Sequence, residues 1–139
     1  VLRDKWKNGA RTFLGMTIAQ FPNLFTVTGP GSPSVLCNMV SAIEQSVEWI
    51  GDCIKHVEEK GYSEIEASHS AENKWTAHVS EAADQTLYPL ASSWYVGANI
   101  SDKARGFMPY VNGLKVYEEA CQREADANYP NFTLAHKIQ

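Results

Sequence analysis

Leu24-Phe25-Thr26-Val27-Thr28-Gly29-Pro30-Gly31-Ser32-Pro33-Ser34 is the stretch of sequence that decides the fold. Residues 24–28 are β-branched, aromatic or aliphatic without polar alternation, which predicts a strand buried on both faces in a parallel sheet. The glycines and prolines that follow predict a sharp turn. Apolar residues then recur at gaps of four and three until Lys60-Gly61, which predicts a helix with one apolar stripe. The stripe consists of Leu36, Val40, Ile43, Val47, Ile50, Ile54 and Val57.

The turn at residues 29–34 is suited to an electron-rich ligand. Glycines let a backbone approach a ligand closely, and a helix N-terminus supplies free N–H groups and the positive end of its dipole. We expect the helix to begin near Ser34, with Ser32 or Ser34 as its cap and Pro33 in its first turn. Cys37 would lie in that first turn, where a lowered thiol pKa and a structural role are both open. Two glycines match neither common nucleotide-binding fingerprint, so an ordinary strand–helix turn is the alternative.

The rest of the chain predicts two further helices, a long loop and two short strands. Ser63-Glu64-Ile65-Glu66 is typical of a capping box and predicts a helix that starts at Ser63. Residues 87–106 predict a loop of a length that usually carries function. Residues 107–111 predict a strand, residues 114–128 a helix, and residues 132–134 a last strand.

Trp94 and Tyr95 form an aromatic pair inside the predicted loop. Such a pair can stack on a ligand ring or close a pocket. The alternative is that both rings anchor the loop to the core. The four histidines follow no metal-ligand spacing and no cysteine pairs with them, so we expect no metal site.

Composition narrows the class of protein. The chain has 139 residues, of which 44% are hydrophobic and 20% charged, which is typical of one globular domain. The net charge is −4 and the basic residues are scattered, which argues against a nucleic-acid binder. No apolar run reaches the roughly 20 residues that a membrane span needs. Three widely spaced cysteines and no leading signal peptide favour a reducing compartment, and we expect a cytoplasmic protein.

Two groups of motifs together resemble one family, the type I Baeyer–Villiger monooxygenases. The first group resembles that family's flavin-proximal strand, turn and helix: Phe21-Pro22-Asn23-Leu24-Phe25, residues 29–34, Asn38-Met39, Ile43-Glu44-Gln45 and Glu48-Trp49. The second group resembles its C-terminal region in the same order: Leu87-Tyr88-Pro89, residues 93–99 and residues 107–113. The resemblance covers about residues 2–134, nearly the whole chain.

The resemblance implies an α/β fold, as the C-terminal fragment of a flavoprotein with two dinucleotide-binding domains. A strand, Gly-rich turn and helix of the FAD domain would be followed by helical and loop segments. Residues 1–62 would then be the C-terminal piece of the FAD-binding domain. Residues 63–139 would be helices, a mobile loop and a tail that pack on the missing remainder. The family's Gly-x-Gly-x-x-Gly fingerprints and catalytic arginine are not in the sequence, so we expect no catalytic residue in this chain, which opens at Val1 without an initiator Met.

The implied activity uses NADPH and O₂ to insert an oxygen atom into a ketone. The product is an ester or lactone, formed through a C4a-peroxyflavin on FAD. The implied partners are the ketone, O₂ and the missing N-terminal part of the same enzyme, with no nucleic acid and no membrane. The fragment alone is expected to be inactive. A non-catalytic binding module derived from the same fold and a fragment of a flavin N- or S-oxygenase are the alternatives.

The resemblance also implies site residues. FAD would meet Gly29, Pro30, Gly31, Asn38 and Met39. The substrate side of the flavin would be lined by Ser34, Val35 and Leu36. Trp94 would cover the bound NADP(H) and approach the substrate cavity.

Overall fold

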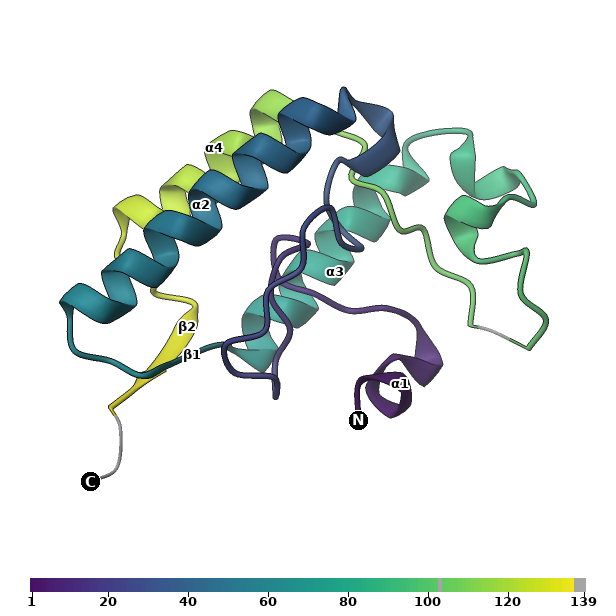
Figure 1. Ribbon diagram of the computed structural model, residues 1–139. Helices are drawn as coiled ribbons and strands as arrows, with labels where there is room; N and C mark the ends of the chain where they lie inside the picture. Colours follow the sequence, from purple (N-terminus) through teal and green to yellow (C-terminus); the bar gives the residue numbers. More distant parts are fainter. Residues whose placement is uncertain (103, 137–139) are drawn as a thin grey trace.

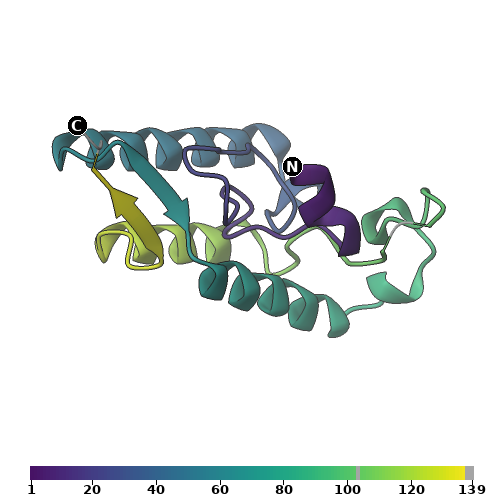
Figure 2. The same ribbon diagram turned by 90° about the horizontal axis from the view of Figure 1, so that it is seen from below.

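A computed structural model describes residues 1–102 and 104–136 of the chain, and of residue 35 only the backbone. The helices and strands in this part are α1 (Leu2–Lys5), α2 (Met39–Glu59), β1 (Glu64–Ala67), α3 (His69–Asp84), α4 (Leu114–Asp126) and β2 (Phe132–Ala135). Short 3₁₀ turns occur at Trp6–Asn8, Ser34–Leu36, Tyr88–Leu90 and Trp94–Val96. Figures 1 and 2 show α2 and α4 side by side, with an irregular N-terminal segment between α2 and α3. The two strands lie near the C-terminal end of α2.

An aromatic core joins α2 and α4 to the irregular segment. Trp49 of α2 donates its indole N–H to the carbonyl of Cys121 in α4 at 2.9 Å. Tyr117 of α4 is fully buried, and its hydroxyl donates to the carbonyl of Leu14 at 2.6 Å. Buried rings contribute large apolar areas, and their polar ends need a partner of this kind. These two bonds therefore fix the helix pair to the segment that leads into the turn at residues 29–34, which is called the glycine turn below.

The helix predicted to start at Ser63 is wrong. Residues from Glu64 onward form β1, which pairs antiparallel with β2 in the register Glu64–Ala135 to Ala67–Phe132. Ile65 and Ala67 are buried, whereas Glu64 is exposed and Glu66 half-buried, an alternation that indicates a strand. Helix α3 begins after Ser68, whose hydroxyl accepts the N–H of Ala71 at 3.2 Å. The capping residue is thus a serine five positions later than predicted.

The strand predicted at residues 24–28 is wrong as a regular strand. Only Phe25 makes a β-bridge, to Thr17. Asn23 and Thr28 adopt left-handed backbone with φ of 58° and 52°, so the extended part between them is very short.

The strand predicted at residues 107–111 is also wrong. Met108 and Tyr110 each make one backbone hydrogen bond to the glycine turn, but Gly31 in the turn has a φ of 87°, which is not strand backbone. The segment therefore runs beside the turn without forming a ladder. The predicted helix near residues 114–128 and the predicted strand near residues 132–134 are confirmed as α4 and β2.

Helix α2 ends as predicted but begins later. Its C-cap is Lys60, followed by Gly61 with φ of 72°. Its N-cap is Asn38 rather than Ser32 or Ser34, because Ser34–Leu36 forms a separate 3₁₀ turn.

The apolar stripe predicted for α2 is mostly not the face that packs within this chain. The buried residues of the helix are Ala42, Ser46, Trp49, Cys53 and Val57. Four members of the predicted stripe, Val40, Ile43, Val47 and Ile54, are 63%, 40%, 54% and 43% exposed. Helix α2 therefore has a second apolar face that nothing in the described residues covers.

A buried ion pair holds the N-terminal segment on α3. Lys5 Nζ lies 2.9 Å from Glu72 Oε2, and Glu72 Oε1 accepts the N–H of Ala19 at 2.9 Å. Glu72 is only 2% exposed, so both of its oxygens need these partners. No helix in the described part of the chain is long and apolar enough to cross a membrane.

Candidate functional site

The glycine turn is held by hydrogen bonds to its carbonyl groups. Ser32 Oγ donates to the carbonyl of Gly29 at 2.7 Å, and the hydroxyl of Thr12 donates to the carbonyl of Pro30. Trp75 Nε1 donates to the carbonyl of Gly31 at 3.1 Å. Consecutive carbonyls of the turn are thus satisfied inside this chain, which fixes the conformation of the turn before any ligand binds.

Both glycines of the turn are required by close packing. A Cβ on Gly31, whose φ is 87°, would lie 3.0 Å from Trp75 Nε1. A Cβ on Gly29 would lie 2.5 Å from the carbonyl oxygen of Gly15 and 2.6 Å from Thr26 Oγ1. These contacts account for the glycines without a ligand. The contact of Gly29, Pro30 and Gly31 with a flavin therefore stays a prediction.

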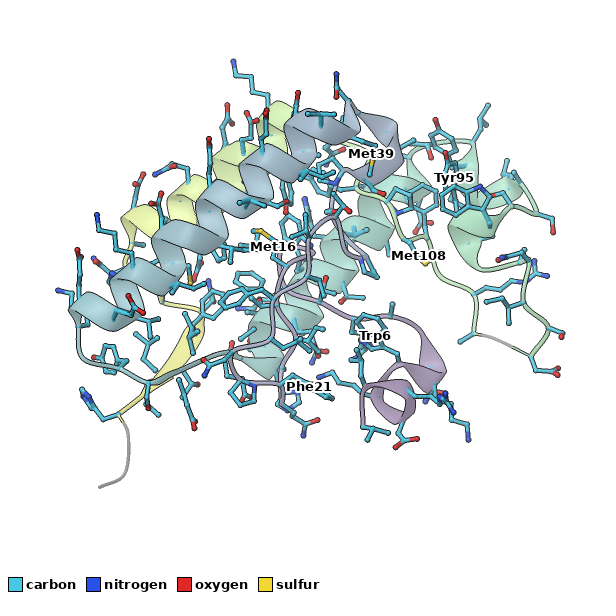
Figure 3. All side chains as sticks on the ribbon, in the orientation of Figure 1. Trp6, Met16, Phe21, Met39, Tyr95 and Met108 are labelled. Carbon is cyan, nitrogen blue, oxygen red and sulfur yellow. The ribbon has the colours of Figure 1, made fainter. Side chains whose placement is uncertain are left out.

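The N-terminus of α2 is open to the surface. Asn38 Oδ1 accepts the N–H groups of Val40 at 3.0 Å and Ser41 at 3.5 Å. The N–H of Met39 lies outside the ladder of the helix, as the first N–H groups of any helix do. Asn38 and Met39 are exposed, and the first turn has no acidic residue. Figure 3 shows Met39 at this end of the helix.

This end of α2 fits an electron-rich ring edge such as that of a flavin. The positive end of the helix dipole favours negative charge, and no carboxylate in the first turn competes with it. Asn38 and Met39 are the residues that would hold such an edge. The fit supports their predicted role and does not test it.

The predicted substrate-side residues lie just before this helix. Ser34, with φ of 47°, and Leu36 are half-buried in the 3₁₀ turn. The side chain of Val35 lies outside the described residues, so its predicted place in a pocket wall stays a prediction.

Cys37 lacks the character of a nucleophile. Burial raises the pKa of the Cys37 thiol, and the nearby Glu118 carboxylate raises this pKa further. Its Sγ donates to the carbonyl of Ser34 at 3.2 Å. A lowered thiol pKa is therefore wrong for this residue, and the structural role is favoured. Among the described residues no three His, Cys, Asp or Glu side chains gather in a way that could hold a metal ion.

The predicted loop at residues 87–106, here called the Trp94 loop, exposes one of its two neighbouring rings and packs the other. Tyr95 is half-buried, with its ring centroid 6.0 Å from that of Tyr88 and 6.2 Å from that of Phe107. Trp94 is 51% exposed and lies beside Tyr95, with 4.3 Å between ring centroids. Neither Tyr88 nor Phe107 belongs to the buried core, so this packing does not anchor the loop to the core, whereas the ring of Trp94 is exposed.

A cleft of about 180 Å³ is enclosed by residues 8–12, the glycine turn, α3 and residues 104–108. Pro30 and Gly31 line it from the turn, Gly97 from the loop, and Trp75 from α3. Asn38, Met39 and Trp94 do not line it among the described residues. The structure thus brings the turn and the loop together but places the start of α2 outside this cleft. The sequence did not predict that Trp75 lines this cleft, because the spacing of Trp75 on α3 indicates only that it lies on a buried helix face.

Comparison with curated proteins identifies monooxygenases as relatives, although no protein-family model matches the chain. The chain is 38% identical over 135 residues to the acetone monooxygenase (methyl acetate-forming) of Gordonia sp. (strain TY-5), covering 96% of this chain and 25% of that protein. It is 39% identical over 131 residues to a Baeyer–Villiger monooxygenase of Pseudooceanicola batsensis, covering 94% and 24%. It is 38% identical over 133 residues to a phenazine N-monooxygenase of Lysobacter antibioticus, covering 96% and 24%. The chain thus spans about a quarter of the length of the curated relatives it matches.

Solved structures agree with these relatives. Cyclohexanone monooxygenase from Rhodococcus sp. Phi1, solved with NADP⁺, superposes with a TM-score of 0.93 at 33% identity, covering 98% of this chain and 25% of that chain. A complex of OTEMO with FAD and NADP superposes with a TM-score of 0.86 at 34% identity, covering 96% and 24%.

The fold is therefore that of part of a flavoprotein monooxygenase, which confirms the α/β fold class. More narrowly, the chain is homologous to the Baeyer–Villiger monooxygenases over about a quarter of their length, and the family resemblance is confirmed.

Proposed function

We propose that this chain acts as the C-terminal portion of a cytoplasmic Baeyer–Villiger monooxygenase that binds FAD and NADPH. The complete enzyme uses O₂ to insert an oxygen atom into a ketone, giving an ester or lactone. The observation that carries the proposal is the homology to ketone monooxygenases over 96% of the chain. Bound FAD supplies the redox and oxygen chemistry, and this chain orients the cofactors and shapes the site.

On this proposal the chain meets the flavin at the turn and at the start of α2. Gly29, Pro30 and Gly31 present a backbone already fixed by internal hydrogen bonds. Asn38 and Met39 present the positive end of α2 to the electron-rich edge of the ring. A group fixed before binding stabilises charge without having to reorganise, which is the basis of electrostatic preorganisation.

Trp94 and the 3₁₀ turn before α2 serve the other two ligands. Trp94 covers NADP(H) with its exposed ring and approaches the substrate, since an indole combines an apolar face with an N–H donor. Ser34, Val35 and Leu36 line the substrate side of the flavin. The specific ketone depends on these three and on residues outside this chain.

The exposed face of α2 supports a partner in the same enzyme. Val40, Ile43, Val47 and Ile54 follow one another along one side of the helix and are all exposed. A contiguous apolar face of this kind usually marks an interface. We propose that residues 1–62 complete the FAD-binding domain by docking this face on the missing N-terminal part. Residues 63–139 pack on that missing part as well.

The test is product analysis with the complete polypeptide that contains this chain. With NADPH, a ketone and ¹⁸O₂, the proposal expects ketone-dependent NADPH oxidation and an ester or lactone that carries one labelled oxygen. NADPH oxidation that no ketone stimulates, or a product without the label, would overturn it.

N-oxygenation is a second candidate, since the phenazine N-monooxygenase matches this chain as closely as the acetone monooxygenase does. The two reactions differ in the acceptor atom, which is a ring nitrogen in one and a carbonyl carbon in the other. The same assay with phenazine distinguishes them. An N-oxide without any ester from ketones would favour the second candidate.

A further inference from the structure

A short strap, residues 106–110, joins the glycine turn to the Trp94 loop. The carbonyl of Met108 accepts the N–H of Gly31 at 2.6 Å, and the N–H of Met108 donates to the carbonyl of Tyr95 at 3.0 Å. A single residue thus bonds both segments through its own backbone. Figure 3 shows Met108 close to Tyr95 on the side of the molecule that carries the loop.

A second bond on each side strengthens the strap. The N–H of Tyr110 donates to the carbonyl of Ser32 at 2.7 Å, and the N–H of Gly106 donates to the carbonyl of Val96 at 3.3 Å. The strap is therefore tied to the turn at two points and to the loop at two points. One backbone segment thus connects the loop to the turn through four hydrogen bonds.

Trp75 of α3 contacts the turn and the strap together. Its indole N–H donates to the carbonyl of Gly31 at 3.1 Å, and its ring stacks on Tyr110 with 5.3 Å between centroids and 15° between planes. Gly31 is therefore held on its N–H by Met108 and on its carbonyl by Trp75. His78, one turn further along α3, lies 3.2 Å from the hydroxyl of Tyr110 and holds the stacked ring.

We propose that Trp75 is a positioning residue that couples the glycine turn to the Trp94 loop through this strap. The inference rests on the proposed function, in which the turn meets FAD and Trp94 meets NADP(H). Binding at one site then affects the other, and by thermodynamic linkage the effect on affinity is reciprocal. The physical basis is a continuous set of bonds with Gly31 fixed on both sides, not proximity alone.

The matched control is Trp49. Like Trp75 it is buried, at 6% exposed against 8%, and its indole N–H also donates to a backbone carbonyl, that of Cys121 at 2.9 Å. It links α2 to α4 and contacts neither the turn nor the strap through that bond. Phenylalanine at either position removes the N–H donor and keeps an aromatic ring.

The experiment compares Trp75→Phe and Trp49→Phe in the complete polypeptide. Both variants lose one buried hydrogen bond, so similar falls in Tm are expected. Only Trp75→Phe is expected to change the absorption spectrum of bound FAD and to weaken NADP⁺ binding, by roughly two- to tenfold as the loss of one hydrogen bond allows. Equal behaviour of the two variants in both readouts would overturn the proposal.

A double-mutant cycle tests the route through the strap. If Trp75 acts on NADP⁺ through the loop, Trp75→Phe adds no further loss of NADP⁺ affinity once Trp94→Ala is present. Additive losses would show that Trp75 acts independently of the loop and would overturn the coupling.

Amide hydrogen exchange tests the coupling in the unsubstituted polypeptide, so the result does not require any variant to fold. In the unsubstituted polypeptide, NADP⁺ should slow exchange at the amide of Gly31 as well as in the loop. Unchanged exchange at Gly31 would overturn the proposal. If the unsubstituted polypeptide binds neither FAD nor NADP⁺, the proposed function itself fails and this inference fails with it.

Discussion

Trp94 and Tyr95 are neighbours in sequence with different surroundings, and substitution should separate their roles. Trp94→Ala removes a half-exposed ring, so the free energy of unfolding should change by less than about 0.5 kcal/mol. NADP⁺ affinity and the ratio of ester formed to NADPH oxidised should both fall, because the covering ring is gone. Tyr95→Ala is the control, which should lower Tm because Tyr95 packs on Tyr88 and Phe107. A wild-type ratio and affinity in Trp94→Ala would contradict a role at the cofactor.

Buried thiols should make the protein less stable in alkali. Burial, the largest cause, raises the pKa of Cys121 from 9.0 to about 12. The unfolded thiol ionises first, so stability is fully present below pH 9 and is lost as the pH rises toward 12. Cys121→Ser removes this ionisation and should make the decline shallower, by roughly 1 kcal/mol per pH unit. Urea unfolding of the complete polypeptide at pH 8 to 11 measures this decline. If the free energy of unfolding falls with pH as steeply in Cys121→Ser as in the unsubstituted protein, the buried Cys121 thiol is not its cause.

Helix α2 offers a separate test of its N-terminus as a flavin contact. Asn38→Ala should cost about 1 kcal/mol of stability, since it removes the oxygen that caps Val40 and Ser41. Asn38→Asp keeps the cap and adds a negative charge at the helix end where, on the proposed function, the negatively charged edge of the reduced flavin would lie. The Asp variant should therefore fold normally, yet its flavin should have a more negative reduction potential. A potential equal to that of the unsubstituted enzyme would place the flavin away from this helix end.

The exposed apolar face of α2 predicts that a charge placed on it lowers the Tm of the complete polypeptide but not that of the isolated chain. Val47→Asp should lower the Tm of the complete polypeptide, because it buries a charge in an interface. In the isolated chain the same change should have little effect on Tm, because Val47 is already in water. Glu48→Ala, on the neighbouring polar face, is the control and should change Tm little in either form. Equal effects of Val47→Asp in both forms would contradict docking through this face.

Helices α2 and α4 were predictable from sequence because their signals are local. The period of α2, its glycine stop at Gly61 and the extent of α4 need only nearby residues. The helix predicted at Ser63 was wrong because β1 pairs with β2, which lies about 70 residues further along the chain. The covered face of α2 is set by the hydrogen bond from Trp49 to Cys121, which is also a contact between residues distant in sequence. The role of Trp75 could not be predicted for the same reason, because its hydrogen bond to Gly31 joins residues 44 positions apart.

At the scale of the whole molecule, the chain should depend on the rest of the enzyme. It spans about a quarter of its relatives and leaves one face of α2 exposed. On the proposed function, its turn and helix N-terminus would form only one side of a flavin site, and a cofactor of this size needs to be largely enclosed to bind tightly.

Flavin content is the measurement that tests this account most directly. The 139-residue chain and the complete polypeptide are each purified with excess FAD, and the yellow absorbance that stays with the protein is quantified. The account predicts one FAD per complete polypeptide, none on the isolated chain, and no ketone-dependent NADPH oxidation by the chain alone. Stoichiometric FAD on the isolated chain, or none on the complete polypeptide, would contradict it.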